Sequence, residues 1–126
     1  MANNRKGFTL IELLVVMSVI ATLLTIAVPR YFQHLDRARE SSLRESLAVM
    51  RDAVDKFRGD TGRYPETLAD LVNKRYLRKV PPDPITESTE TWVIVPPPDE
   101  PGQRKVWDIR SGAEGQGLNG SDYATW

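Results

Sequence analysis

A single acidic side chain stands inside a long apolar run near the beginning of this sequence. Glu12 is the only ionisable side chain between residues 8 and 28. At about 1.5 Å of rise per residue, a helix over this run is roughly 30 Å long, which is the thickness of the hydrocarbon core of a bilayer. A charged side chain exposed to lipid there costs about 2.5–3.5 kcal/mol. Glu12 therefore indicates a functional site that requires a partner.

The residues before the run carry positive charge. Arg5 and Lys6 precede Gly7, and basic residues at one end of a spanning helix favour the cytoplasmic side for that end. A secretory signal peptide has a shorter apolar core and a small-residue cleavage site, which residues 27–30 match poorly. A plain membrane anchor remains an alternative, but it requires neither the acid nor the glycine before the run.

Residues 6–12, with the sequence KGFTLIE, resemble the processing motif of type IV pilins and pseudopilins. The resemblance implies that a prepilin peptidase cleaves between Gly7 and Phe8 and methylates the new amino group of Phe8. Glu12 is then the fifth and Pro29 the twenty-second residue of the mature chain, the positions at which the family has these residues.

The chemistry of the new N-terminus supports this resemblance. Cleavage creates a positive amine on Phe8 beside the apolar helix. In a filament this amine can pair with the Glu12 carboxylate of a neighbouring subunit. Each charge alone is costly in an apolar bundle, whereas a pair offsets both costs and specifies the register. We expect Phe8, Glu12 and Pro29 to be the assembly residues.

Composition limits the remaining functions. The 126 residues suit one small domain, and the sequence has no cysteine and one histidine, His34, which we interpret as a surface or subunit-contact residue. Without Arg5 and Lys6 the chain has 15 basic and 17 acidic side chains, so nucleic acid is not an expected partner. No nucleophile elbow, phosphate loop or zinc spacing is present. We therefore expect a structural protein and not an enzyme.

Residues 30–58 have the pattern of an amphipathic helix, and Gly59 is the expected C-cap. The helix either continues through Pro29 with a kink or loosens around it. Glu40 and Arg44 are spaced for an ion pair on the charged face. One apolar stripe is expected to be buried: Leu43, Leu47, Met50, Val54 and Phe57.

The rest of the chain predicts a small antiparallel sheet packed on this helix, and thus an α+β fold. Residues 60–72 are expected to form a turn and then a short helix, with Pro65 in the first turn of that helix. Strands are expected at residues 91–95 and 106–110, and a loop from Ser111 onward. The predicted divisions are a leader at 1–7, a transmembrane or filament-core helix at 8–29, and a periplasmic head at 30–126.

The head resembles the major pseudopilins of type II secretion, the general secretion protein G family. The resemblance rests on GRYP at 62–65, YLRKVP at 76–81 and WDIRSGAEG at 107–115, whereas residues 83–89 depart from the family pattern. It implies a structural calcium in the C-terminal loop, whose ligands here would be Glu114, Asn119, Ser121 and Asp122. The alternative is that the glycines only permit tight turns, closed by packing of Tyr123 and Trp126.

The resemblance implies a subunit of the type II secretion pseudopilus, a homopolymer that moves folded proteins from the periplasm across the outer membrane. Its implied partners are the prepilin peptidase, minor pseudopilins, an inner-membrane platform protein and an assembly ATPase. It also implies a single-pass inner-membrane location, with a cytoplasmic N-terminus and a periplasmic head. An extracellular type IV pilus and a non-filamentous anchored module are the alternatives.

Overall fold

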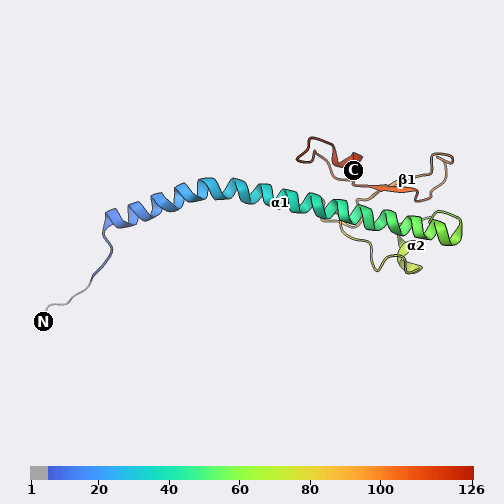
Figure 1. Ribbon diagram of the computed structural model, residues 1–126, viewed down its shortest axis with the longest axis horizontal. Coiled ribbons are helices and arrows are strands. Elements are labelled where there is room, and N and C mark those ends of the chain that lie inside the picture. Colours follow the sequence, from blue (N-terminus) through green and yellow to red (C-terminus); the bar gives the residue numbers. More distant parts are fainter. Residues whose placement is uncertain (1–5) are drawn as a thin grey trace. The chain divides into compact units, whose positions relative to one another are not determined.

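The computed structural model describes residues 6–126, and the chain divides into two compact units, Met1–Leu35 and Asp36–Trp126. Most of the expected leader at 1–7, including Arg5, lies outside the described residues. Within the described part of the chain the elements are α1 (Leu10–Thr61), α2 (Leu68–Asn73), β1 (Val93–Val95), β2 (Asp108–Arg110) and the 3-10 turn η1 (Tyr123–Thr125) (Figure 1). The prediction of an α+β fold is confirmed.

From residue 13 to residue 28, α1 carries no ionisable side chain. An 18-residue window of α1 near the N-terminus has a mean hydropathy of 2.5, and none of it is buried. By length and composition this helix can cross a membrane. Its hydroxyl groups on Ser18, Thr22 and Thr25 each donate to the carbonyl four residues earlier, at 2.7–2.8 Å. These three hydroxyl donors are therefore bonded within the helix and need no partner in an apolar environment.

Helix α1 continues through Pro29, which lies inside it. The sequence left open whether the helix continues through Pro29 or loosens around it, and in the single chain it continues. Whether the helix loosens there in an assembled filament stays a prediction.

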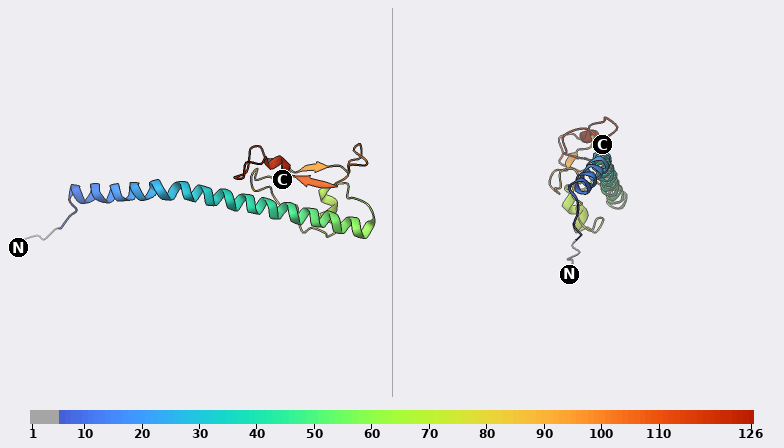
Figure 2. Two further views of the ribbon diagram at one scale, coloured as in Figure 1. Left: turned by 45° about the horizontal axis from the view of Figure 1, so that its top comes forward. Right: turned by 90° about the vertical axis from the view of Figure 1, so that its left-hand side faces the viewer.

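The apolar stripe expected on the second half of α1 is confirmed. Leu43, Leu47, Met50, Val54 and Phe57 are buried and belong to one core cluster with residues of the sheet and α2, among them Leu71 and Ile109. A period of 3.6 residues places these side chains on one face of the helix. The two strands lie alongside this part of α1 (Figure 2).

The predicted C-cap was wrong. Helix α1 includes Gly59 and ends at Thr61. The residue after it, Gly62, has φ of +74°, and its N–H donates to the carbonyl of Arg58 at 2.9 Å. Only glycine adopts this left-handed conformation without a steric cost, so Gly62 terminates the helix.

Helix α2 begins one turn later than expected. Thr67 is its N-cap, and Thr67 and Asp70 form a reciprocal capping box. Pro65 is therefore not in the first turn, as predicted. It is buried before the cap, and its carbonyl accepts the N–H of Val106 at 2.7 Å.

Strands β1 and β2 pair antiparallel as predicted, with Ile94 opposite Ile109, although each is only three residues long. The segment from Ser111 onward is mostly irregular. It nevertheless contains η1 and an isolated bridge between Gln116 and Asp122, so the prediction of an ordered loop without helix or strand was incomplete.

Candidate functional site

The Gly7–Phe8 bond lies before α1, in irregular and exposed backbone. The Phe8 side chain is 91% exposed. A Cβ atom on Gly7 would meet no other atom of the described residues within 4 Å, and Gly7 has no positive φ. The fold of residues 6–126 therefore does not itself require glycine at position 7, and the predicted cleavage site is sterically accessible.

Glu12 and Thr9 cap the beginning of α1. The Glu12 N–H donates to Thr9 Oγ1 at 3.2 Å, and the Thr9 N–H donates to Glu12 Oε2 at 3.4 Å. This is a capping box, whose sequence signal is a Thr followed three residues later by a Glu. The sequence reasoning missed it, although the signal was present. In the single chain Glu12 thus has a structural role, and its carboxylate accepts from the N–H of Thr9, the residue that follows Phe8.

The three predicted assembly residues, Phe8, Glu12 and Pro29, are all exposed in the first unit. The surface around them is apolar. Lipid or protein must cover a contiguous apolar surface of this size. The large apolar residues of the first unit that are at least half exposed are Phe8, Leu10, Ile11, Leu13, Leu14, Val15, Val16, Met17, Val19, Ile20, Leu23, Leu24, Ile26, Tyr31 and Phe32.

In the C-terminal loop, residues 114–126, the four predicted calcium ligands have other surroundings. Glu114 and Asp122 are exposed. Asn119 Oδ1 accepts from the N–H of Ser121 at 3.0 Å and from its Oγ at 2.6 Å, and Ser121 Oγ accepts from Trp126 Nε1 at 2.7 Å. No group of three or more His, Cys, Asp or Glu residues able to hold a metal occurs within residues 6–126.

The interior of this loop is filled by a carboxylate from α1. Glu40, only 7% exposed, accepts through Oε1 from the Leu118 N–H at 2.7 Å and from the Tyr123 hydroxyl at 3.1 Å. Burial raises the pKa of Tyr123, and the hydrogen bond to Glu40 and its charge raise it further. The expected Glu40–Arg44 ion pair is absent from the described residues, since the Arg44 guanidinium lies over the Trp126 ring, 4.3 Å from its centroid.

The loop therefore does not fit a calcium site built from the four predicted side chains. Calcium takes six to eight oxygen ligands, many of them carbonyls in glycine-rich loops. Here the carbonyls of Gly115, Gly117 and Ser121 accept backbone N–H groups of the loop at 2.8–3.1 Å. The alternative, in which packing of Tyr123 and Trp126 closes the loop, agrees with the edge-to-face contact of their rings, whose centroids are 5.1 Å apart. Calcium binding itself stays a prediction.

Arg51 joins three segments of the second unit. Its Nε pairs with Asp108 Oδ1 at 2.8 Å, and its Nη2 donates to the carbonyls of Ile109 and Trp126, each at 2.8 Å. A planar guanidinium can serve several acceptors at fixed angles, which lysine cannot. Arg51 therefore links α1 to β2 and to Trp126, the residue after η1.

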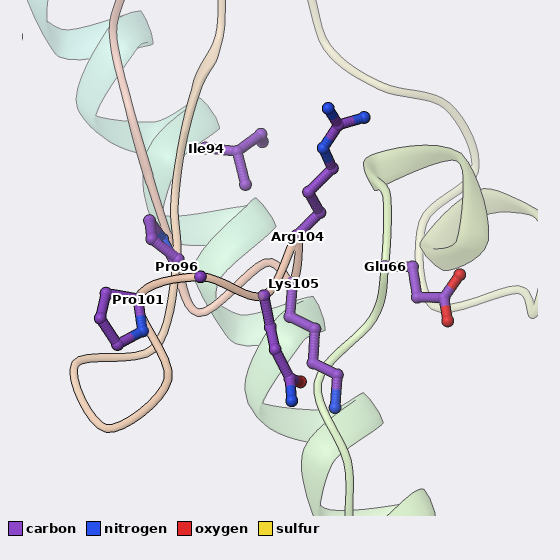
Figure 3. A pocket seen from close by; sticks show the side chains of 8 residues that line it. Glu66, Ile94, Pro96, Pro101, Arg104 and Lys105 are labelled. Carbon is purple, nitrogen blue, oxygen red and sulfur yellow. The ribbon is translucent and has the colours of Figure 1, made fainter.

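A shallow cavity of about 370 Å³ lies beside the β1–β2 connection. Figure 3 shows Ile94, Pro96 and Pro101 around it, with Arg104 and Lys105 pointing away from each other. Within the described part of the chain, its lining includes no Ser, Thr, His or Cys. His34 is exposed on α1, as expected.

The capped apolar helix after a Gly–Phe bond, together with a small α+β unit, has the features that the resemblance to type IV pilin-like proteins implies. Residues 2–28 match the family model described as the prokaryotic N-terminal methylation motif. The exposed apolar helix fits anchoring in the inner membrane.

Over nearly its whole length the chain is similar to proteins named Type II secretion system core protein G. It is 26% identical to the protein of Escherichia coli K12, with 98% of this chain and 92% of the relative covered. It is 28% identical to the protein of Pseudomonas aeruginosa, with 98% and 96% covered. It is also 33% identical to fimbrial protein EcpC of Eikenella corrodens, but over only 60% of this chain and 53% of that protein. No solved structure matches this chain.

Proposed function

We propose that this chain is a structural subunit of a pilus-like filament, the pseudopilus of type II secretion. The observation that carries the proposal is the exposed apolar segment of α1, with Glu12 held at its first turn behind an accessible Gly7–Phe8 bond. The similarity to core protein G covers 98% of the chain and supports the same function.

The free energy of burying apolar surface permits such a chain to assemble. Transfer of the apolar helix from lipid to a bundle of like helices is nearly neutral, because both surroundings are apolar. The geometry of the polymer must then come from packing and from polar pairs. We propose that the methylated amine of Phe8 in one subunit pairs with the Glu12 carboxylate of the next.

The proposed partners follow from this function. A prepilin peptidase would cleave the chain on the cytoplasmic side, and a platform protein with an assembly ATPase would extract it from the inner membrane. Minor pseudopilins and other copies of the chain would be its filament partners. The second unit would face the periplasm, since Lys6 at the other end of the apolar segment favours the cytoplasm.

A surface pilus is the second candidate, because part of the chain is similar to a fimbrial protein. A host strain that lacks the protein separates the functions. Secreted enzymes retained in the periplasm would support the pseudopilus. Loss of surface fibres with normal secretion would favour the pilus. Normal secretion and fibres, together with an uncleaved chain that forms no filament on overproduction, would favour a non-filamentous anchor.

A further inference from the structure

A buried carboxylate on α1 lies at the centre of the C-terminal loop. Glu40 contacts residues 78 and 83 positions away: its Oε1 accepts from the Leu118 N–H at 2.7 Å and from the Tyr123 hydroxyl at 3.1 Å. A carboxylate that is only 7% exposed is stable only if such donors replace its hydration. The two donors come from the middle and the end of the loop, so one side chain holds both parts against the helix.

The loop backbone lies close to Glu40 at Gly117. A Cβ atom on Gly117 would stand 3.1 Å from Glu40 Oε1 and would overlap the Trp126 ring. Glycine at this position therefore permits the close approach of the loop. The Arg44 guanidinium lies over the Trp126 ring, 4.3 Å from its centroid.

The polarity of this centre is opposite to that of a calcium site. Calcium is bound by oxygen atoms that point inward, with carbonyls and carboxylates around a cation. Here an N–H and an O–H point inward at an anion. A charged hydrogen-bond acceptor is about twice as strong as a neutral one.

We propose that the Glu40 carboxylate takes the place of a metal ion in this chain, so that the C-terminal loop is ordered on α1 without calcium. The proposal concerns the folded subunit. It holds or fails independently of secretion and of filament formation.

The test is amide hydrogen exchange, measured by mass spectrometry on the full chain in detergent micelles. Exchange of residues 114–126 is compared in millimolar calcium chloride and in EGTA. The wild-type protein is expected to give the same exchange in both. Slower exchange in calcium would overturn the proposal.

Substitutions test the carboxylate directly. Glu40→Ala is expected to speed exchange in the loop at least about tenfold, as loss of a hydrogen bond to a charged group implies. Glu45→Ala, at an exposed position of the same helix, is the matched control and is expected to leave exchange unchanged. Loop exchange in Glu40→Ala equal to that in Glu45→Ala would overturn the proposal.

Glu40→Gln serves if the alanine variant does not fold. The amide keeps an acceptor oxygen but loses the charge, so the loop should exchange faster than in Glu45→Ala and slower than in Glu40→Ala. Exchange equal to that of Glu45→Ala would show that the charge has no role and would contradict the proposal.

Discussion

Thr9 and Glu12 hold each other's backbone N–H groups across the first turn of α1, at 3.2 and 3.4 Å. This relationship gives Glu12 a role in the single chain beside its proposed role between subunits. The carboxylate also lies near the positive end of the helix dipole, where a negative charge is stabilised. The two roles make different predictions for substitutions, because glutamine can cap a helix but carries no charge.

Glu12→Gln should insert into the membrane normally but assemble poorly, because it keeps the cap and loses the ion pair. Glu12→Ala should show the same defect in assembly. Membrane fractionation and electron microscopy of sheared filaments measure the two steps. Thr9→Val is the matched control, since it weakens the cap by about 0.5–2 kcal/mol and leaves the charge in place. Normal filaments from Glu12→Gln, with poor filaments from Thr9→Val, would assign Glu12 to capping alone.

Arg51→Ala should lower the free energy of unfolding by about 1–3 kcal/mol, because Asp108 and two carbonyls lose a charged donor. The expected change is a clear drop in the melting temperature of the detergent-solubilised chain. Arg39→Ala, at an exposed position of the same helix, controls for the loss of a positive charge. Equal melting temperatures of the two variants would contradict the contacts of Arg51.

Gly117→Ala should destabilise the C-terminal loop, because the added methyl group overlaps the Trp126 ring and crowds Glu40. Crowding of this kind costs about 1–3 kcal/mol. Gly102→Ala is the control, since a Cβ there meets no atom of the described residues within 4 Å. Tryptophan fluorescence and thermal unfolding should change in the first variant only. An unchanged Gly117→Ala protein would mean that the loop is not packed as described.

Stability should fall at alkaline pH through Tyr123. Burial, and then the hydrogen bond to Glu40, raises the pKa of this phenol above its ordinary value of 10.0. A raised pKa in the folded state gives stability that is complete below the unfolded pKa and is lost as the pH rises through the folded one. Tyr123→Phe should therefore show a smaller loss of urea resistance between about pH 9 and pH 11 than the wild type.

Tyr76 provides the comparison for this experiment. Its pKa is also raised, chiefly by the hydrogen bond to Asp60 at 2.7 Å. Tyr76→Phe should remove a separate part of the alkaline loss. An alkaline loss in Tyr123→Phe as large as in the wild type would contradict the buried contact with Glu40.

Features that depend on local periodicity were predictable from the sequence. The stripe from Leu43 to Phe57 repeats every three or four residues, and that spacing alone places it on one helix face. The two strands were recognisable by their β-branched and aromatic residues. The end of α1 was not, because Gly59 and Gly62 are both glycines within one turn and only the backbone conformation distinguishes them.

Contacts between distant residues could not be read from the sequence. Glu40 stands among charged residues of a helix and has the spacing of an ordinary pair with Arg44, so nothing local indicates that it faces Leu118. Arg51 also stands among charged residues of the helix, and nothing local indicates that it contacts Asp108, Ile109 and Trp126. The Thr9–Glu12 cap was readable from its spacing, but the cost of a charge in the membrane directed the interpretation of Glu12 toward pairing alone.

The mass and N-terminal sequence of the protein isolated from membranes of its host test the central claim most directly. The account predicts a chain that begins at Phe8 with a methylated amino group, and a Gly7 variant, such as Gly7→Val, that stays uncleaved. A mature protein that still begins at Met1 would contradict it.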